Sequence, residues 1–499
     1  MKQRYIRYCY FWLLAMLLVA SCGQHPSVPS SSKEAKCLPA IFPDYCNVTV
    51  PCNIAPLNFM LPLEEYTGCV ARFTTPDGQQ QTYGDGAKVM MPEDEWHAML
   101  QAAKGKSLKV EVWGEKEGQW LAFSPFEIHV APEPIDEYVS YRLIEPTYVA
   151  WNFMEIAQRN LTTFEETQVF NNERTCNDRE KGQCINCHSY QNYRTDNMLF
   201  HVRLSNSGTV LVDDGKVKRI NLKRDMSAFG GAYPSWHPTQ KLIAFSANKT
   251  RQAFHTLHLN KIEVYDEASD LILYDVEKDS VTVICETDSL LEVYPTWSPD
   301  GKYLYYCKTV ALPDSLRDKD IRSTYTYLQY NLYRLPFNLD NRTFGEEEMV
   351  YDAASLDKSA TLPRISPDGR YLLFAEGQYG CFHSRHHDAD IVCLPLAKGQ
   401  GEPDRPRLDL SRLNSQGQSD SYPSWSSNGR WIMCASRRED GTYSRIYFSY
   451  FHDGKAEKAF LMPQQDPELN TWLLKSYNRP EFMVEPVKIS VEEFSRVFE

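Results

Sequence analysis

The stretch YPTWSPDGKYLYYCK at residues 294–308 decides the fold, because close copies of it recur along the second half of the chain. The copies read YPSWHPTQKLIAFSA at 233–247, LPRISPDGRYLLFAE at 362–376 and YPSWSSNGRWIMCAS at 422–436. Neighbouring copies are roughly 60–70 residues apart, and self-similarity at a near-constant period is typical of repeat architectures. A stack of unrelated hairpins is the alternative, which the shared register of the copies disfavours.

Each copy contains a loop, a tight turn and a strand, in that order. In three copies an Asp-Gly or Asn-Gly pair supplies the positive φ that a hairpin turn needs. The apolar run after the turn predicts a buried strand. Further strands, such as residues 270–277, lie between the copies. Four strands per repeat with this connectivity indicate the blade of a β-propeller.

A degenerate fifth copy with the same order of loop, turn and strand covers residues 187–203. A sixth blade comes either from residues 137–172 or from strands at the two ends of the chain that close one ring. Closure is favoured because an open array would leave strand edges exposed. We therefore predict a mainly β fold built on a six-bladed propeller.

Here a family resemblance becomes specific. The units with the pattern YPxWSPDG resemble the WD40-like repeats of TolB-like propellers over residues 187–465. The segment FLMPQQDPELNTWLLKSYNRPEFM at 460–483 is similar to the C-terminal signature of a family of bacterial lipoproteins. That family joins such a propeller to a Cys-x-x-Cys-His segment. The resemblance implies an architecture, whereas function has to be inferred from the site.

The N-terminus has the features of a bacterial export signal. Lys2, Arg4 and Arg7 form a basic region before an apolar run that is too short to span a bilayer. The run ends in Leu-Val-Ala-Ser-Cys, which resembles a lipobox and predicts that Cys22 is acylated. An ordinary signal peptide with a chance cysteine is the alternative. Residues 1–21 are thus expected to be removed from the mature chain.

The mature chain is expected to be anchored in a membrane. Each CH₂ group of an acyl chain that is buried in the bilayer contributes ~0.8 kcal/mol to membrane binding. Two or three acyl chains therefore anchor a protein stably, whereas a single chain does not. The Pro/Ser-rich residues 22–37 predict a tether between the anchor and the first domain. Gly23 follows the cysteine where an acidic retention signal would stand. We therefore expect an outer-membrane location, at the periplasmic face.

Composition narrows the class of protein. The formal net charge is −13, which argues against nucleic acid as a partner. The chain has fourteen cysteines, and an exported protein meets an oxidising compartment where disulfides form. Spacing leaves the connectivity open. No Gly-x-Ser-x-Gly, phosphate-loop or His-Glu-x-x-His motif is present, so a binding protein is favoured over an enzyme.

The region before the propeller has a different sequence pattern and lacks the repeat. Residues 38–132 contain short alternating segments and a turn at Pro-Asp-Gly, which predict a small β-sandwich of immunoglobulin type. Residues 133–183 are expected to be a helical and strand linker or a first blade, with an amphipathic helix over 148–161. The propeller proper is expected over 184–465. Residues 466–499 are expected to pack on it as a tail.

The one motif with specific chemistry is Cys184-Ile185-Asn186-Cys187-His188. In c-type cytochromes, two such thiols bind haem and the adjacent histidine ligates the iron, and the family resemblance supports the same assignment here. Met198 or His201 would then supply the distal ligand. A disulfide, or a reduced pair with Cys176 as a third thiol, is the main alternative. Zinc is disfavoured because no further ligands have metal spacing nearby.

A weaker constellation involves His387, Asp390 and Asp270. The two aspartates stand at equivalent strand starts in different repeats, which favours a structural role over a metal site. His255 and His258 lie in a matching loop two repeats away. Loops on one propeller face converge on the channel, so these histidines are candidates for neighbours of His387.

Two functions from different classes follow from these features. The first is a membrane-anchored periplasmic binding or scaffold module of the cell envelope, with or without one covalent haem c. It would bind an envelope protein or polysaccharide through the propeller face and the membrane through its lipid anchor. The second is a monohaem electron-transfer protein coupled to an envelope redox partner.

Overall fold

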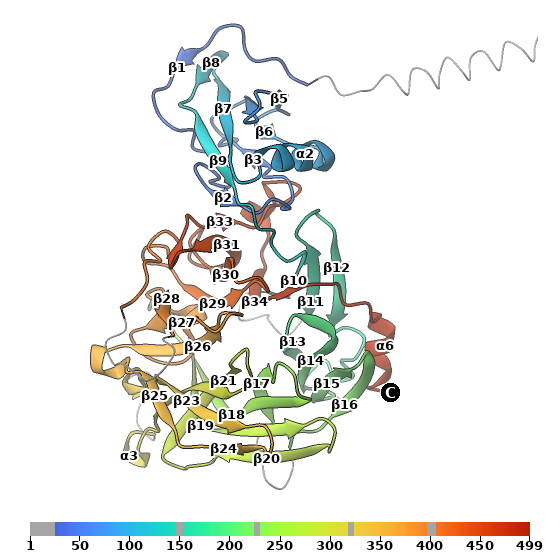
Figure 1. The fold of residues 1–499 in the computed structure, drawn as a ribbon, viewed down its shortest axis with the longest axis vertical. Helices are drawn as coiled ribbons and strands as arrows, with labels where there is room; N and C mark the ends of the chain where they lie inside the picture. Colours follow the sequence, from blue (N-terminus) through green and yellow to red (C-terminus); the bar gives the residue numbers. More distant parts are fainter. Residues whose placement is uncertain (1–24, 146–152, 224–229, 318–323, 397–405) are drawn as a thin grey trace, which may run out of the picture.

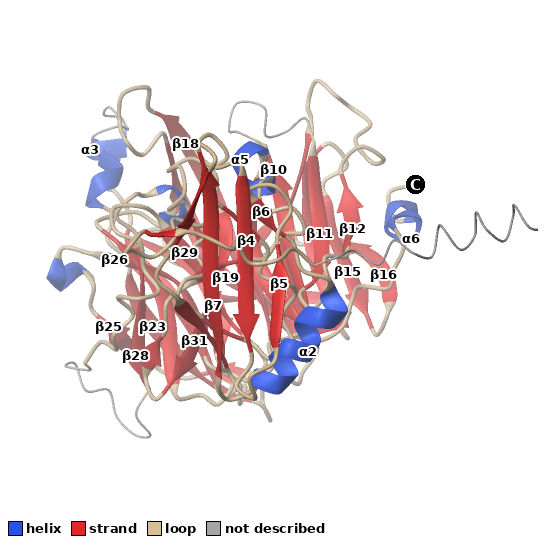
Figure 2. Cartoon of the chain, turned by 90° about the horizontal axis from the view of Figure 1, so that it is seen from above, coloured by secondary structure: helices blue, strands red, loops and turns tan. Residues whose placement is uncertain are grey.

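The computed structural model describes residues 25–145, 153–223, 230–317, 324–396 and 406–499. Strands make up most of the regular structure, and the few helices lie at the periphery (Figure 2). In these ranges no helix is both long enough and apolar enough to cross a membrane. Cys22, the predicted lipidation site, lies outside the described residues.

The first domain is a mixed sheet with one helix, drawn in blue and cyan at the top of Figure 1. The sheet has the order β1-β8-β7-β4-β5, with β9 paired to β7 and to β2, while β3 and β6 pair separately. Helix α2 buries Trp96, whose indole N–H donates to the Ile54 carbonyl at 2.9 Å. The elements are β1 (Lys33–Glu34), β2 (Thr49–Val50), β3 (Phe59–Met60), β4 (Gly68–Thr74), β5 (Gln80–Tyr83), β6 (Lys88–Val89), α2 (Glu93–Ala103), β7 (Ser107–Lys116), β8 (Gln119–Ala122) and β9 (Phe126–Val130).

The remaining strands form sheets arranged around a common centre (Figure 1). One sheet joins the two ends of the region, with the order β12-β11-β10-β34. Its strands are β10 (Tyr138–Ile144), β11 (Met154–Asn160), β12 (Glu166–Asn171) and β34 (Ser476–Met483). Next comes a four-stranded sheet of β13 (Gln183–Gln191), β14 (Arg194–Leu204), β15 (Gly208–Asp213) and β16 (Lys216–Ile220).

The later strands follow the same plan. A large sheet contains β17 (Gly231–Trp236), β18 (Leu242–Phe254), β19 (Ile262–Asp275), β20 (Ser280–Cys285), β21 (Leu290–Trp297), β22 (Tyr303–Val310), β23 (Asn331–Asn338), β24 (Thr343–Phe344) and β25 (Glu348–Tyr351). The only ladder pairing between its two halves among the described residues is one parallel pair, Ser269 with Leu291. Two more sheets contain β26 (Ser359–Ile365), β27 (Tyr371–Gly377), β28 (Asp390–Pro395), β29 (Asp420–Trp425), β30 (Trp431–Ser436), β31 (Arg445–His452), β32 (Lys455–Ala456) and β33 (Phe460–Leu461).

Six strands, namely β13, β17, β21, β26, β29 and β34, form a closed ring. Each strand contacts the next in this order, and β34 contacts β13 again. Figure 1 shows these strands surrounding the centre of the lower body, with their sheets radiating outwards. This arrangement confirms the prediction of a mainly β protein with a β-propeller.

Every strand of this ring has a bulge at the same place. The register shifts there, and one residue adopts a positive φ: Cys187, Tyr233, Tyr294, Leu362, Tyr422 or Arg479. In all but the first strand a proline follows, which suits a bulge because no ladder hydrogen bond is required of it. Cys187-His188 therefore occupies the position that Tyr-Pro holds in the repeats.

One predicted helix is a strand in the structure. Residues 154–160, within the expected helix over 148–161, form β11, and residues 146–152 lie outside the described ranges. β11 hydrogen-bonds to β10 on one side and to β12 on the other. Pairing on both edges outweighs the local helical pattern, because it satisfies the backbone groups and buries both faces.

The C-terminal segment is part of the ring as well as packing on it. β34 pairs with β10, while α6 (Val491–Arg496) places Phe494 against the rings of Phe170 and Phe200. The remaining short helices are α3 (Asp314–Arg317), α5 (Leu469–Trp472) and the 3₁₀ turns η2 (Tyr325–Tyr327), η3 (Ala354–Leu356) and η4 (His383–Arg385).

The first domain is docked firmly on the propeller. The Lys458 ammonium lies 2.7 Å from the Asp44 carboxylate, and the Tyr45 hydroxyl donates to the Leu461 carbonyl at 3.3 Å. One hydrophobic core includes residues of both, such as Trp96 and Trp431. This packing sets the orientation of the domain relative to the ring.

Candidate functional site

A pocket of about 330 Å³ opens at one end of the ring. Its floor comes from the bulges of the ring strands, through Cys187, Tyr233, Tyr422 and Arg479. Its walls come from β10, β14, β18, β19 and the loop that contains η4. We call it the arginine pocket, because four arginines line it: Arg142, Arg203, Arg385 and Arg479.

Two of these arginines have structural partners. Arg142 donates to the Ile185 carbonyl at 3.0 Å and to Asn478 Oδ1 at 2.7 Å, which ties β10 to its neighbours. Arg479 donates to the Glu481 carboxylate at 3.3 Å, on the far side of the bulge. Both guanidinium groups are therefore held in place before any ligand arrives.

The other two arginines have no such partner. Within the described ranges, neither the Arg203 nor the Arg385 side chain makes a hydrogen bond or an ion pair. Burial lowers the pKa of Arg385 to about 10, and nearby Arg142 contributes to the shift. Behind Arg385, burial also lowers the pKa of Arg437, with Arg385 as a further cause. This end of the channel thus concentrates positive charge, which the buried Asp266 carboxyl near Arg203 offsets only in part.

The two motif thiols line the same pocket. Cys184 is 4% exposed and Cys187 is 9% exposed, and both are free thiols in the structure. Burial raises the pKa of Cys184, so this thiol stays protonated and carries no charge. Among the described residues no cysteine forms a disulfide, including Cys37, Cys46, Cys52 and Cys69.

The motif histidine points elsewhere. His188 is 1% exposed and does not line the arginine pocket. Its ring centroid lies 6.1 Å from that of Tyr190. Burial lowers its pKa to about 3, so the imidazole is neutral. The reason is the bulge, since the positive φ of Cys187 turns the chain between the thiol and the imidazole.

These positions do not fit covalent haem. The group needs both thiols and the adjacent imidazole at one macrocycle, but the thiols face a pocket that the imidazole does not reach. The candidate distal ligands are also enclosed. Met198 is fully buried in a hydrophobic core, and His201 is hydrogen-bonded to Thr209 at 2.7 Å.

A visible spectrum checks this conclusion. We expect the protein to be colourless when it is produced in a host that matures c-type cytochromes, because His188 is enclosed. A Soret band that survives denaturation would show covalent haem and contradict it. His188→Ala in the same host is the control, since that change would alter the spectrum only if the imidazole ligates iron.

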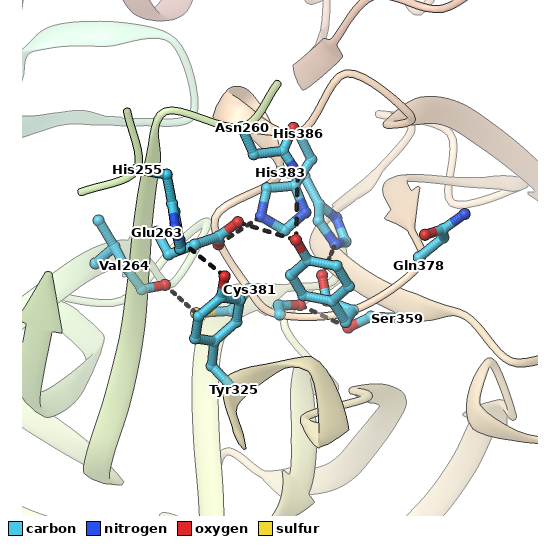
Figure 3. Close-up of polar contacts among 12 residues, drawn as sticks. His255, Asn260, Glu263, Val264, Tyr325, Ser359, Gln378, Cys381, His383 and His386 are labelled. Carbon is cyan, nitrogen blue, oxygen red and sulfur yellow. Dashed lines mark hydrogen bonds and ion pairs between the residues drawn. The ribbon is translucent and has the colours of Figure 1, made fainter. Parts of the chain in front are cut away.

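A buried polar network fixes one wall of the arginine pocket. Figure 3 shows Glu263 of β19 facing His386, with His386 Nε2 2.7 Å from the Glu263 carboxylate. The Tyr379 hydroxyl donates to the same carboxylate at 3.1 Å. Both partners come from the loop between β27 and β28, so the network anchors that loop against β19. The loop carries Phe382 and Arg385 into the pocket wall.

The structure brings together only some of the second set of candidate residues, which includes His255, His387 and Asp390. The loops that contain His255 and His387 meet, because His387 Nδ1 lies 2.9 Å from the Asn260 side chain. His255 itself lies 2.9 Å from the Tyr325 hydroxyl, as Figure 3 shows. Asp390 begins β28, and burial with nearby Asp420 raises its pKa to about 6.

No metal centre is assembled from these side chains. Asp270 lies within β19, in a different sheet from Asp390. In the described part of the chain, no three His, Cys, Asp or Glu side chains are arranged as metal ligands. The residues that the sequence did not single out are Glu263, Arg142, Arg203 and Arg479, which no motif connects.

Comparison with known proteins adds little to this geometry. No protein-family model and no curated protein matches the chain. Among solved structures, similarity is found to a nidogen/laminin complex, with 9% identity and a TM-score of 0.39 over 70% of this chain and 100% of that one. The tricorn protease has 11% identity and a TM-score of 0.35, over 72% and 33% of the chains. The β-propeller domain of Myceliophteria thermophila Cps50 (Swd1) has 10% identity and a TM-score of 0.29, over 55% and 85%. At this level of similarity no activity, ligand or partner is transferred to this chain.

Proposed function

We propose that this protein is a membrane-anchored periplasmic lipoprotein that acts as a binding module of the cell envelope. The arginine pocket is its ligand site. The observation that carries the proposal is the pocket itself, where side chains from five separated parts of the chain place cationic, phenolic and amide groups in one concavity. Binding sites combine a mostly preformed concavity with a few converging polar groups in this way.

The anchor and the location belong to the same proposal. Acylated Cys22 would hold the mature chain at the periplasmic face of the outer membrane, with residues 22–37 as a tether. The first domain is docked on the propeller, so it would fix the direction in which the ring faces. A partner protein or polysaccharide of the envelope would approach the exposed propeller face and place a group in the pocket.

For the architecture we propose a TolB-like propeller of six blades. The support is the cycle of ring strands, each of which has the same bulge. The first blade would take its inner strand, β34, from the C-terminus and its other strands from β10 to β12. For the first domain we keep the prediction of an immunoglobulin-like sandwich.

A ligand screen tests the binding function. The mature full-length protein is heated with eight-carbon probes that carry an anionic, cationic or neutral head. We expect at least one probe to raise the melting temperature, since a ligand at a hundredfold excess over Kd stabilises by about 2.7 kcal/mol. The exposed side chain of Gln252 lines the pocket, so Gln252→Trp should abolish the response by filling the entrance.

The control is Gln79→Trp, which changes an exposed side chain of the first domain and should leave the response intact. A wild-type protein that responds to no probe would contradict the assignment of this pocket. A response that survives Gln252→Trp would place the ligand elsewhere and also contradict it.

A further inference from the structure

We propose that the arginine pocket binds an amphiphilic anion, which places a carboxylate or phosphate head between Arg203 and Arg385 and a short apolar body against the rim. This inference rests on the proposed binding function and names its ligand class. The two heads share one chemistry, a planar or tetrahedral oxyanion that accepts paired hydrogen bonds from guanidinium groups.

The positive charge in the pocket walls favours an anionic ligand. A buried charge without a partner is costly, and buried charges are therefore normally paired. Arg203 and Arg385 are half-buried and make no hydrogen bond or ion pair among the described residues, and burial lowers the pKa of Arg437, with neighbouring Arg385 as a further cause. The whole chain has a net charge of −13, so this concentration of positive charge is a local feature.

The acidic groups in and near the pocket compensate this charge only in part. Burial raises the pKa of the Cys184 thiol and of the Tyr233 phenol, so both groups are neutral at physiological pH. The Glu481 carboxylate already has Arg364 at 2.8 Å and Arg479 at 3.3 Å. Burial raises the pKa of Asp266, the carboxyl that acts on Arg203, to about 6, and no carboxylate is paired with Arg385 among the described residues, so a bound anion would supply the remaining negative charge.

The hydrophobic side chains at the rim of the pocket favour a ligand with an apolar part attached to its anionic head. Leu204 is 47% exposed and Phe254 is 46% exposed, although both are large hydrophobic side chains. Ile262, Val264 and Phe382 continue the apolar wall towards the arginines. A volume of about 330 Å³ lies at the small end of ligand pockets, which suits a short chain.

The wall is fixed before the ligand binds. Phe382 and Arg385 lie on the loop that Glu263 anchors through His386 and Tyr379. A preformed site loses less conformational entropy on binding than a site that must be ordered. The Glu263–His386 pair is thus a positioning element for the pocket and does not contact the ligand.

Calorimetric titration of the mature full-length protein tests the inference. The probes are octanoate, octyl phosphate, 1-octanol and octylamine, each below its micelle-forming concentration. We expect octanoate or octyl phosphate to bind at least tenfold more tightly than 1-octanol, and octylamine to bind more weakly still. The ratio between the two anions tells which head the pocket prefers.

Variants identify the groups responsible. Arg203→Gln and Arg385→Gln should each weaken the better anion at least tenfold and leave the affinity for 1-octanol within about twofold. Arg370→Gln is the matched control, because Arg370 is exposed, pairs with Asp368 at 2.6 Å and lies outside the pocket. Arg385→Lys keeps the positive charge but loses the planar guanidinium that donates paired hydrogen bonds. This variant should therefore bind the better anion with an affinity between those of the wild type and Arg385→Gln.

A second readout separates a binding role from a structural one. Without ligand, Arg385→Gln should melt at the same temperature as the wild type or higher, because it removes a half-buried charge that has no ion-pair partner among the described residues. A lower melting temperature would show that Arg385 stabilises the fold and would overturn the assignment. Equal affinity for 1-octanol and the anions would overturn the inference but leave the binding function standing. Binding of no probe would overturn both.

Discussion

Glu481→Gln is expected to lower the free energy of unfolding by about 3 kcal/mol, at the low end of the cost of breaking a buried ion pair. Glu481 lies on β34 with its side chain only 17% exposed. Its carboxylate accepts from Arg364 at 2.8 Å and from Arg479 at 3.3 Å. Glutamine keeps the shape and one acceptor but removes the negative charge, so two enclosed guanidinium groups would lose their counter-ion.

The interaction of Glu481 with Arg364 and Arg479 also predicts that the stability of the protein depends on pH. Burial alone would raise the pKa of Glu481, but Arg364 and Arg479 hold it below its ordinary value of 4.5. A carboxyl with a lowered folded-state pKa stabilises the protein above its unfolded-state pKa, and this contribution is lost as pH falls through the folded-state value. The wild type should therefore lose stability below about pH 4.5, and the part due to Glu481 should be missing in the variant.

Urea denaturation at pH 7 and at pH 3.5 measures both effects. Glu485→Gln is the matched control, because Glu485 forms an exposed pair with Lys488 at 2.9 Å and such pairs contribute about 0–1 kcal/mol. A loss below 1 kcal/mol in Glu481→Gln at pH 7 would show that the channel is wet enough to screen the charges, and the expected cost would be wrong.

Truncation after Lys475 is expected to abolish cooperative unfolding, because it removes β34 and opens the ring. β34 pairs with β10 over most of its length and buries Tyr477, Phe482 and Met483. Without it, the backbone groups of β10 on that edge lose their partners and a sheet edge is exposed to aggregation. The measurement is the amount of soluble protein and the width of its thermal transition.

Complementation provides the control for this truncation. A separate peptide of residues 476–499 should restore solubility and a cooperative transition, since the strand needs no covalent link to pair with β10. The same peptide with Phe482→Asp should fail, because Phe482 is 2% exposed. A truncated protein that folds cooperatively by itself would show that the ring is stable when open.

Local features of the sequence were sufficient to predict the propeller. The repeated Tyr-Pro segment, the Asp-Gly turns and the apolar strands are short-range signals, and the structure forms each of them where the repeats predict. The sequence favoured a closed ring, because an unpaired sheet edge is unfavourable, but left open whether residues 137–172 or strands from the two ends complete it. In the structure β10, β11 and β12 share one sheet with β34. The helix predicted over 148–161 was wrong over 154–160, where pairing with β10 and β12 outweighs the local pattern.

The tertiary structure decided the site. Cys184, Cys187 and His188 are adjacent in sequence, but the bulge directs the thiols into the pocket and encloses the imidazole. The arginines at 142, 203, 385 and 479 have no common motif, and only the closed ring brings them together. By itself the sequence determined the repeat, the turns and the expected export signal, because those depend on neighbouring residues. The charge of the pocket depends on residues more than 300 positions apart, so only the folded ring determines it.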